Sequence, residues 1–120
     1  MSLNSYAKDG ILTVCFTDAR ILDEAKLEQV GNDLLAMLNQ TTEERVILDF
    51  RAVQFMSSSM LGKLVLVHKK CKEFKVQLKL CAISSDIHQV FKITKLDKLF
   101  DIEADEAAAR KAFMRRGWFG

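Results

Sequence analysis

Apolar and polar residues recur along the chain in two different periods, one typical of strands and one typical of helices. Near the N-terminus, Asp9-Gly10 separates a short polar segment at residues 5–8 from ILTVCF at residues 11–16, which predicts a β-hairpin. Leucine and valine then recur at helical spacing behind Asp23, a favourable N-cap residue. We therefore predict an amphipathic helix from Asp23 to about Asn39.

The remainder of the chain continues to alternate between strand and helix patterns. RVILDF at residues 45–50 is short, β-branched and almost wholly apolar, as expected of a central strand that is covered on both faces. A helix follows three serines at residues 57–59, and its tightest apolar stripe consists of Met60, Leu64, Val67, Cys71 and Phe74. Later elements are predicted as a strand at 76–82, a helix at 84–94, a strand at 100–102 and an alanine-rich helix at 105–114.

This order of elements predicts the fold class. Parallel neighbouring strands need a crossover, usually a helix, so strands that alternate with helices favour an α/β layer with parallel pairing. There is no proline, no internal repeat and no linker-like segment. We predict a single α/β domain over residues 1–120, a mixed and mostly parallel β-sheet with helices packed mainly on one face, and a flexible tail at residues 115–120.

Composition and charge exclude several classes of protein. About half of the residues are hydrophobic (49%), 28% are charged and the formal net charge is +2, which is ordinary for a globular domain and gives no argument for a nucleic-acid or membrane partner. Neither a signal peptide nor a membrane-spanning run is visible. The three cysteines lack C-x-x-C spacing and lie among apolar residues, which favours a reducing compartment and a cytoplasmic protein.

Catalytic chemistry finds little support in the sequence. His68 or His88 could serve as the base of a serine hydrolase, but no G-x-S-x-G elbow is present and no acid accompanies the serines. Glycine-rich phosphate loops and clusters of metal ligands are also lacking. We predict that the protein is not an enzyme and uses no cofactor and no metal.

A second alternative is binding to nucleic acid through basic residues and aromatics. The candidate residues are Lys63, Lys69, Lys70, Lys72, Lys75, Lys79 and the segment RRGWF at 115–119. Glu73 and the acidic stretch at 101–106 offset these charges, so a solvated helix face is the favoured interpretation. Trp118 and Phe119 lie outside any periodic pattern and receive no assignment.

The three serines take on meaning when they are considered with their flanking sequence. By themselves, serines before a helix are explained by N-capping, in which a hydroxyl accepts a bond from a free N–H of the first turn. The segment VILDFRAVQFMSSSMLGKL at residues 46–64 and the later TKLDKLFDI at 94–102 together resemble the STAS domain, the module of bacterial anti-sigma factor antagonists. Asp49-Phe50 matches the end of the family's central strand, and Val53-Gln54-Phe55 matches the segment that follows it.

The resemblance extends over nearly the whole chain and places a modification site. Ser57-Ser58-Ser59-Met60 aligns with the family's Asp-Ser-Ser-Gly or Asp-Ser-Thr-Gly signature, so Ser57 stands where the family has an acid and Met60 where it has glycine. The aligned phosphoacceptor is Ser58.

The resemblance implies a function in bacterial signal transduction and transcription regulation. It implies that the unmodified protein binds an anti-sigma factor that is often itself a serine protein kinase, and that phosphorylation of Ser58 releases this partner. We expect the partner-binding residues to be Ser57, Ser58, Ser59, Met60, Lys63 and Leu66. The alternative is a STAS scaffold module of a sensory or transporter complex that is not phosphorylated. The sequence leaves a homo-oligomer open.

Overall fold

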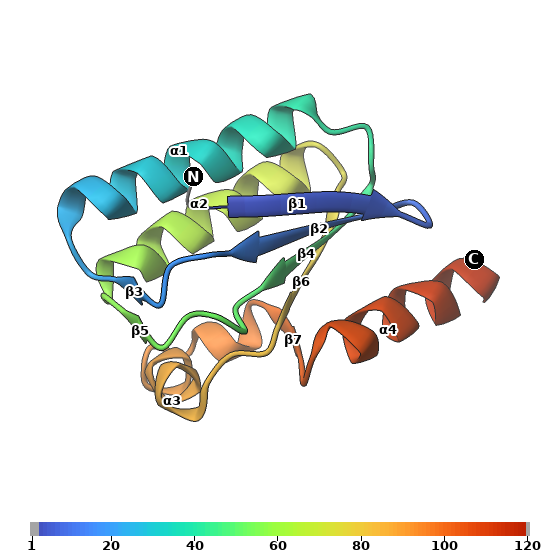
Figure 1. Ribbon diagram of the computed structural model, residues 1–120. Helices are drawn as coiled ribbons and strands as arrows, with labels where there is room; N and C mark the ends of the chain where they lie inside the picture. Colours follow the sequence, from blue (N-terminus) through green and yellow to red (C-terminus); the bar gives the residue numbers. More distant parts are fainter. Residues whose placement is uncertain (1–2, 120) are drawn as a thin grey trace.

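The computed structural model describes the backbone of residues 3–119 and the side chains of residues 3–115 (Figure 1). The strands are β1 (Leu3–Lys8), β2 (Ile11–Phe16), β3 (Arg20–Ile21), β4 (Arg45–Asp49), β5 (Phe55–Met56), β6 (Gln77–Cys81) and β7 (Asp101–Glu103). The helices are α1 (Glu24–Gln40), α2 (Ser59–Glu73), α3 (Ser85–Ile93) and α4 (Glu106–Phe119), with a 3₁₀ turn, η1 (Leu96–Lys98), after α3.

Five strands form the main sheet in the order β1-β2-β4-β6-β7. The β1–β2 hairpin is antiparallel, and all other neighbours in this sheet are parallel. Asp9 and Gly10 both have positive φ, +56° and +76°, as a tight two-residue hairpin turn requires. The prediction of a mixed, mostly parallel sheet that begins with a hairpin is confirmed.

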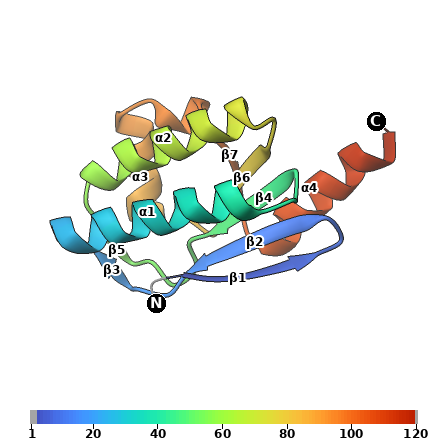
Figure 2. The ribbon, with the colours of Figure 1, turned by 90° about the horizontal axis from the view of Figure 1, so that it is seen from above.

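Helices cover both faces of the sheet unequally. Helices α1, α2 and α3 lie on one face, and α4 alone crosses the other (Figures 1 and 2). Alternate strand residues point to opposite faces, so Leu12 and Val14 of β2 enter the main core under α1 and α2, whereas Ile11 enters a smaller core with Ala109 and Phe113 of α4. The prediction that the helices pack mainly on one face of the sheet is therefore confirmed.

Side chains cap two of the helices, α1 at the predicted Asp23 and α3 at Ser84. The Asp23 carboxylate accepts a bond of 2.7 Å from the N–H of Lys26 at the start of α1. The Ser84 hydroxyl accepts one of 3.3 Å from the N–H of Ile87 at the start of α3. These bonds satisfy donors that a helix N-terminus otherwise leaves without partners.

Three details differ from the sequence-based expectation. Phe74, assigned to the apolar stripe, is the C-cap of α2 and is exposed, because the helix ends before its side chain reaches the core. Lys79, counted among surface lysines, is only 3% exposed because α4 covers it. Helix α4 also runs to Phe119, past the predicted end at Met114. The side chains of Trp118 and Phe119 lie outside the described residues, and the flexible tail stays a prediction.

Candidate functional site

The segment between β4 and α2 is anchored by the buried carboxylate of Asp49. Its Oδ1 accepts a 2.9 Å bond from the N–H of Arg51, and its Oδ2 lies 3.8 Å from the Cys15 thiol on the adjacent strand. The N–H of Phe50 donates to the carbonyl of Cys81 at 3.0 Å. Together these bonds turn the chain out of the sheet directly after β4.

A two-stranded parallel sheet then carries the chain to the serines. Strands β3 and β5 pair in register, Arg20 with Phe55 and Ile21 with Met56. The N–H of Ser57 continues this ladder by donating to the carbonyl of Ile21 at 2.9 Å. The backbone that leads into α2 is therefore fixed by hydrogen bonds on both sides of the loop, at the end of the molecule where α1 and α2 begin (Figure 1).

The three serines have different surroundings. Ser58 and Ser59 are exposed, and Ser57 is half-buried. Ser58 occupies the N-cap position of α2, but its hydroxyl makes no capping bond. Its backbone is helical instead, with φ −62° and ψ −25°, and the carbonyls of Ser57 and Ser58 accept bonds of 3.0 Å from the N–H groups of Met60 and Leu61. The explanation that a serine side chain caps this helix is wrong, and the Ser58 hydroxyl has no structural task there.

Ser57 presents a different feature. Its Oγ atom is buried and has no hydrogen-bond partner within the described part of the chain. A buried hydroxyl without a partner costs about 1–3 kcal/mol. The STAS signature has an acidic residue at this position. In this chain the position holds a serine whose hydroxyl oxygen is enclosed by the loop.

The other predicted contact residues are arranged unevenly. Met60 is 0% exposed and packs in the main core, so the expectation that its side chain meets a partner is wrong. Its position on the inward face of the first helical turn is the physical reason. Lys63 is partly covered by α1, where its Nζ lies 2.9 Å from a carboxylate oxygen of Glu28. Leu66 is exposed on the outer side of α2, as predicted.

The fold brings apolar residues to the serines that sequence reasoning did not single out. Phe55 and Leu22 are 47% and 45% exposed. The guanidinium carbon of Arg20 lies 4.8 Å from the centre of the Phe55 ring. Leu22 directly follows β3 and Phe55 begins β5, so both flank the backbone that leads to Ser57. Phe55 belonged to the recognised motif, but Leu22 and Arg20 gave no local signal, because their pairing with β5 is a tertiary contact.

The titratable groups do not form a catalytic arrangement. His68 stacks edge-on against Phe100, with ring centres 5.4 Å apart, and burial lowers its pKa, assisted by the charge of Lys72. Burial raises the pKa of the Cys71 thiol to about 11 and that of Cys81 to about 12, which makes both thiols poor nucleophiles. Within residues 3–119, no cluster of side chains is suited to a metal ion, and no helix is long and apolar enough to cross a membrane.

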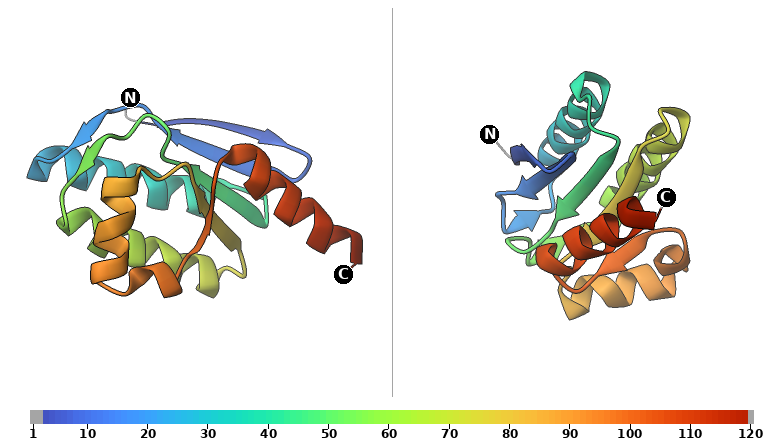
Figure 3. Two further views of the ribbon diagram at one scale, coloured as in Figure 1. Left: turned by 90° about the horizontal axis from the view of Figure 1, so that it is seen from below. Right: turned by 90° about the vertical axis from the view of Figure 1, so that its right-hand side faces the viewer.

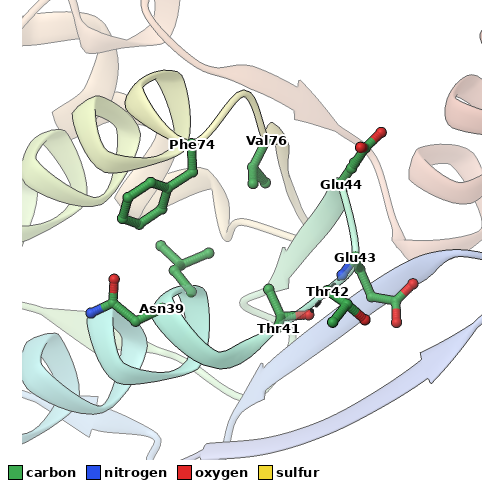
Figure 4. Close-up of a pocket in the computed structure, with 8 residues that line it drawn as sticks. Asn39, Thr41, Thr42, Glu43, Glu44, Phe74 and Val76 are labelled. Atoms are coloured by element: carbon green, nitrogen blue, oxygen red, sulfur yellow. Dashed lines mark hydrogen bonds between the residues drawn. The ribbon is translucent and has the colours of Figure 1, made fainter.

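An open pocket of about 400 Å³ lies at the other end of α1 and α2, away from the serines (Figure 4). It is lined by Leu38, Asn39, Thr41, Thr42, Glu43, Glu44, Phe74 and Val76. The Thr41 hydroxyl in its wall accepts a bond of 3.1 Å from the N–H of Glu43. The only ionisable side chains among these lining residues are two glutamates, and no histidine, cysteine or lysine accompanies them.

Comparison with known proteins agrees with this architecture of a helix-covered sheet. The family model for the STAS domain matches residues 3–109. A protein described as an anti-sigma factor antagonist, BtrV of Bordetella bronchiseptica, is 29% identical over 113 residues, which cover 94% of this chain and 95% of that protein.

Solved structures show the same fold. A STAS-domain protein from Planctomyces limnophilus matches with a TM-score of 0.79 at 23% identity, over 92% of this chain and 96% of that one. The Bacillus cell-fate determinant SpoIIAA, in its phosphorylated form, matches with a TM-score of 0.67 at 16% identity, over 92% and 98%.

The chain therefore belongs to the STAS domain family. Among its relatives it is similar to anti-sigma factor antagonists. That family is non-enzymatic, which agrees with the prediction that the chain is not an enzyme.

Proposed function

We propose that this protein is a phosphorylation-controlled binding partner of an anti-sigma factor that is also a serine kinase, with Ser58 as the phosphoacceptor. The observation that carries the proposal is an exposed Ser58 whose hydroxyl is not used in capping α2. A hydroxyl that bonds nothing in the fold can be modified without removing a stabilising contact. The similarity to BtrV supplies the class of partner, and the bacterial cytoplasm is the location that this function requires.

The fold can accommodate a phosphate at this position. The first turn of α2 contains no acidic residue, and the N-terminus of a helix favours a nearby anion by about 0.3–1 kcal/mol. A structural relative, SpoIIAA, has been solved both phosphorylated and unphosphorylated. We therefore expect phosphorylated Ser58 to leave the domain folded.

The effect on a partner is expected to be larger than the effect on the fold. An interface that closes over a neutral hydroxyl must desolvate a dianion after modification, at a cost of several kcal/mol unless the partner supplies cations. A loss of about 3 kcal/mol corresponds to more than a hundredfold weaker binding. Phosphorylation thus separates the partners without unfolding either one.

The apolar residues beside the serines complete the proposed interface. Phe55 is exposed at a place where the backbone is held by β3, and an exposed, pre-positioned aromatic ring is a typical binding hot spot. Leu22 extends the same apolar surface. Together with Ser57, Ser58, Ser59, Lys63 and Leu66 they form the face that we assign to the partner. Met60 supports this face from within the core.

The test compares substitutions at two helix N-termini in a binding assay with the kinase recovered from the native organism. Ser58→Asp is expected to weaken binding at least tenfold, whereas Ser58→Ala retains it. Ser85→Asp places the same charge at the exposed start of α3 and is expected to bind normally. Equal binding by both Ser58 variants would support the alternative of a STAS scaffold that is not phosphorylated.

Phosphopeptide mapping tests the site itself. Incubation with that kinase and ATP is expected to modify a peptide that contains Ser58. Ser59→Ala, a neighbouring exposed serine, should still be phosphorylated, and Ser58→Ala should not. Stoichiometric modification at another residue would contradict the assignment of Ser58.

A further inference from the structure

A lysine-rich surface lies beside the second half of α2, away from the serines, and the carboxylates next to its lysines are those of Glu73 and the half-buried Asp97. It consists of five exposed lysines and two exposed aliphatic residues, here called the lysine surface: Lys69, Lys72, Lys92, Lys95, Lys98, Ile93 and Leu99. Among the described residues, none of these five lysines forms a salt bridge with a carboxylate. By contrast, Lys63, Lys70 and Lys79 each have an acidic partner.

Aromatic contacts hold the two parts of this surface together. The ring of Phe100 lies 5.4 Å from His68 of α2 and 5.8 Å from Phe91 of α3. Phe100 immediately follows Leu99, and Lys72 lies one helical turn beyond His68. Phe100 therefore joins the chain that follows η1 to α2; Figure 3 shows the backbone from α3 to β7 from two further sides. Lys92, Lys95 and Lys98 belong to this part of the chain, and Lys69 and Lys72 lie on α2 next to His68 and one turn beyond it. The charge of Lys72 also contributes to lowering the pKa of His68, although burial is the larger cause.

Lys95 has a backbone conformation that the fold alone would assign to glycine. Its φ is +64°, in the left-handed region, where a side chain with a Cβ atom is strained and glycine is not. Its N–H donates to the carbonyl of Lys92 at 3.0 Å, which any residue could do. Strained residues that persist are found most often at functional positions. Lys75 has the same left-handed conformation after α2, so the φ of Lys95 shows only that the fold holds a lysine at this exposed corner.

The apolar members of the surface indicate more than diffuse attraction of anions. Ile93 is 79% exposed, more than any other large hydrophobic residue described, and Leu99 is also exposed. Both lie within the segment that carries Lys92, Lys95 and Lys98. A ligand that matches this pattern needs carboxylates for the lysines and aliphatic groups for Ile93 and Leu99.

We propose that the lysine surface binds an acidic, leucine-rich or isoleucine-rich segment of a second protein. Charge complementarity selects an acidic partner, and two isolated aliphatic residues are too small an apolar area for insertion into a bilayer. The surface is separate from the phosphorylation site, because His68 lies ten residues beyond Ser58, about 15 Å along α2. The protein can therefore hold this partner whether or not Ser58 is modified.

The test uses the full chain labelled with ¹⁵N and a glutamate–leucine copolymer as the acidic probe. Addition of the copolymer is expected to shift the amide signals of residues 92–99 and of Lys69 and Lys72, with little change at residues 57–59. Poly-glutamate without leucine is expected to bind more weakly. Shifts centred elsewhere, equal binding of single-stranded RNA, or binding only to phosphatidylserine vesicles would overturn the proposal.

Matched charge variants separate this surface from general electrostatics. The test variant carries Lys72→Gln, Lys95→Gln and Lys98→Gln, and the control carries Lys8→Gln, Lys75→Gln and Lys111→Gln. Both lose three charges, and only the first is expected to lose affinity for the copolymer, by about fivefold or more. Ser58→Asp should bind the copolymer as tightly as the wild type. Equal losses in both lysine variants would refute a specific site.

Discussion

Lys79 forms ion pairs with two carboxylates that are far more exposed than the lysine itself. Removing the lysine and removing the carboxylates should therefore change the stability of the protein by different amounts. The lysine side chain is 4% exposed, and its Nζ lies 3.3 Å from Asp101 and 3.7 Å from Glu103. It also lies 5.1 Å from the ring centre of Phe113 on α4. The two carboxylates remain 58% and 29% exposed, so they keep much of their hydration whether or not the lysine is present.

The two ways of breaking this cluster should differ in cost. The double variant Asp101→Asn with Glu103→Gln leaves a buried ammonium without a counter-charge. Loss of one side of a buried pair costs about 3–5 kcal/mol, which we lower to about 2–4 kcal/mol because Asp101 is largely solvated. Lys79→Met removes the buried charge itself and leaves two solvated carboxylates, so the free energy of unfolding should change by about 1 kcal/mol or less. The lost cation–π contact with Phe113 accounts for most of that change.

Urea unfolding at neutral pH, followed by circular dichroism, measures both costs. The m-value of each variant should equal that of the wild type, which shows that the comparison concerns stability and not the extent of unfolding. The reasoning is refuted if Lys79→Met destabilises the protein as much as the double variant, because the ion pairs would then contribute a net stabilisation larger than the desolvation of the lysine.

Three further predictions concern stability. Lys75, which follows α2, has a left-handed φ of +59°, and its N–H donates to the carbonyl of Lys72. Lys75→Gly should therefore raise the free energy of unfolding by about 0.5–1 kcal/mol in urea titrations. A decrease would contradict left-handed strain at this residue. A Cβ at Gly62 of α2 meets no atom within 4 Å, so Gly62→Ala should stabilise by about 1 kcal/mol in the same assay, and a loss would point to an unseen clash. Burial raises the pKa of the Cys71 and Cys81 thiols from 9.0 to about 11 and about 12, so the unfolded chain ionises first. The stabilisation that the two neutral thiols give the folded protein is complete below pH 9 and is lost as the pH rises toward 11 for Cys71 and toward 12 for Cys81, by up to about 1.4 kcal/mol per pH unit for each thiol. Cys71→Ala with Cys81→Ala should show a shallower decline, and an identical decline would refute the assignment.

The main elements of the fold could be predicted from the sequence because their signals are local. ILTVCF alternates after an Asp-Gly turn, RVILDF is a continuous apolar run, and Asp23 begins a helical periodicity, so each segment carries its own evidence. Strands β3 and β5 were not predicted. They contain two residues each and exist only because they pair with each other across a long stretch of chain.

The candidate site was predicted in part, for the same reason. Ser58 and the start of α2 follow from a motif within one short segment. The burial of Met60 could have been foreseen from its place in the apolar stripe, since a side chain on the inward face of the first turn is not available to a partner. The exposure of Leu22 beside Phe55 could not, because it depends on the pairing of β3 with β5.

The sequence by itself determined the α/β order of elements, the helix that begins after the serines, and the resemblance that points to Ser58. The tertiary structure alone decided that the Ser58 hydroxyl makes no cap, that Lys79 is buried under α4, and that Phe100, which follows η1, meets His68 of α2. The physical reason is the distance along the chain over which each interaction acts. Periodicity and capping act over a few residues and are written in consecutive positions, whereas burial and charge clustering depend on which distant segments pack together.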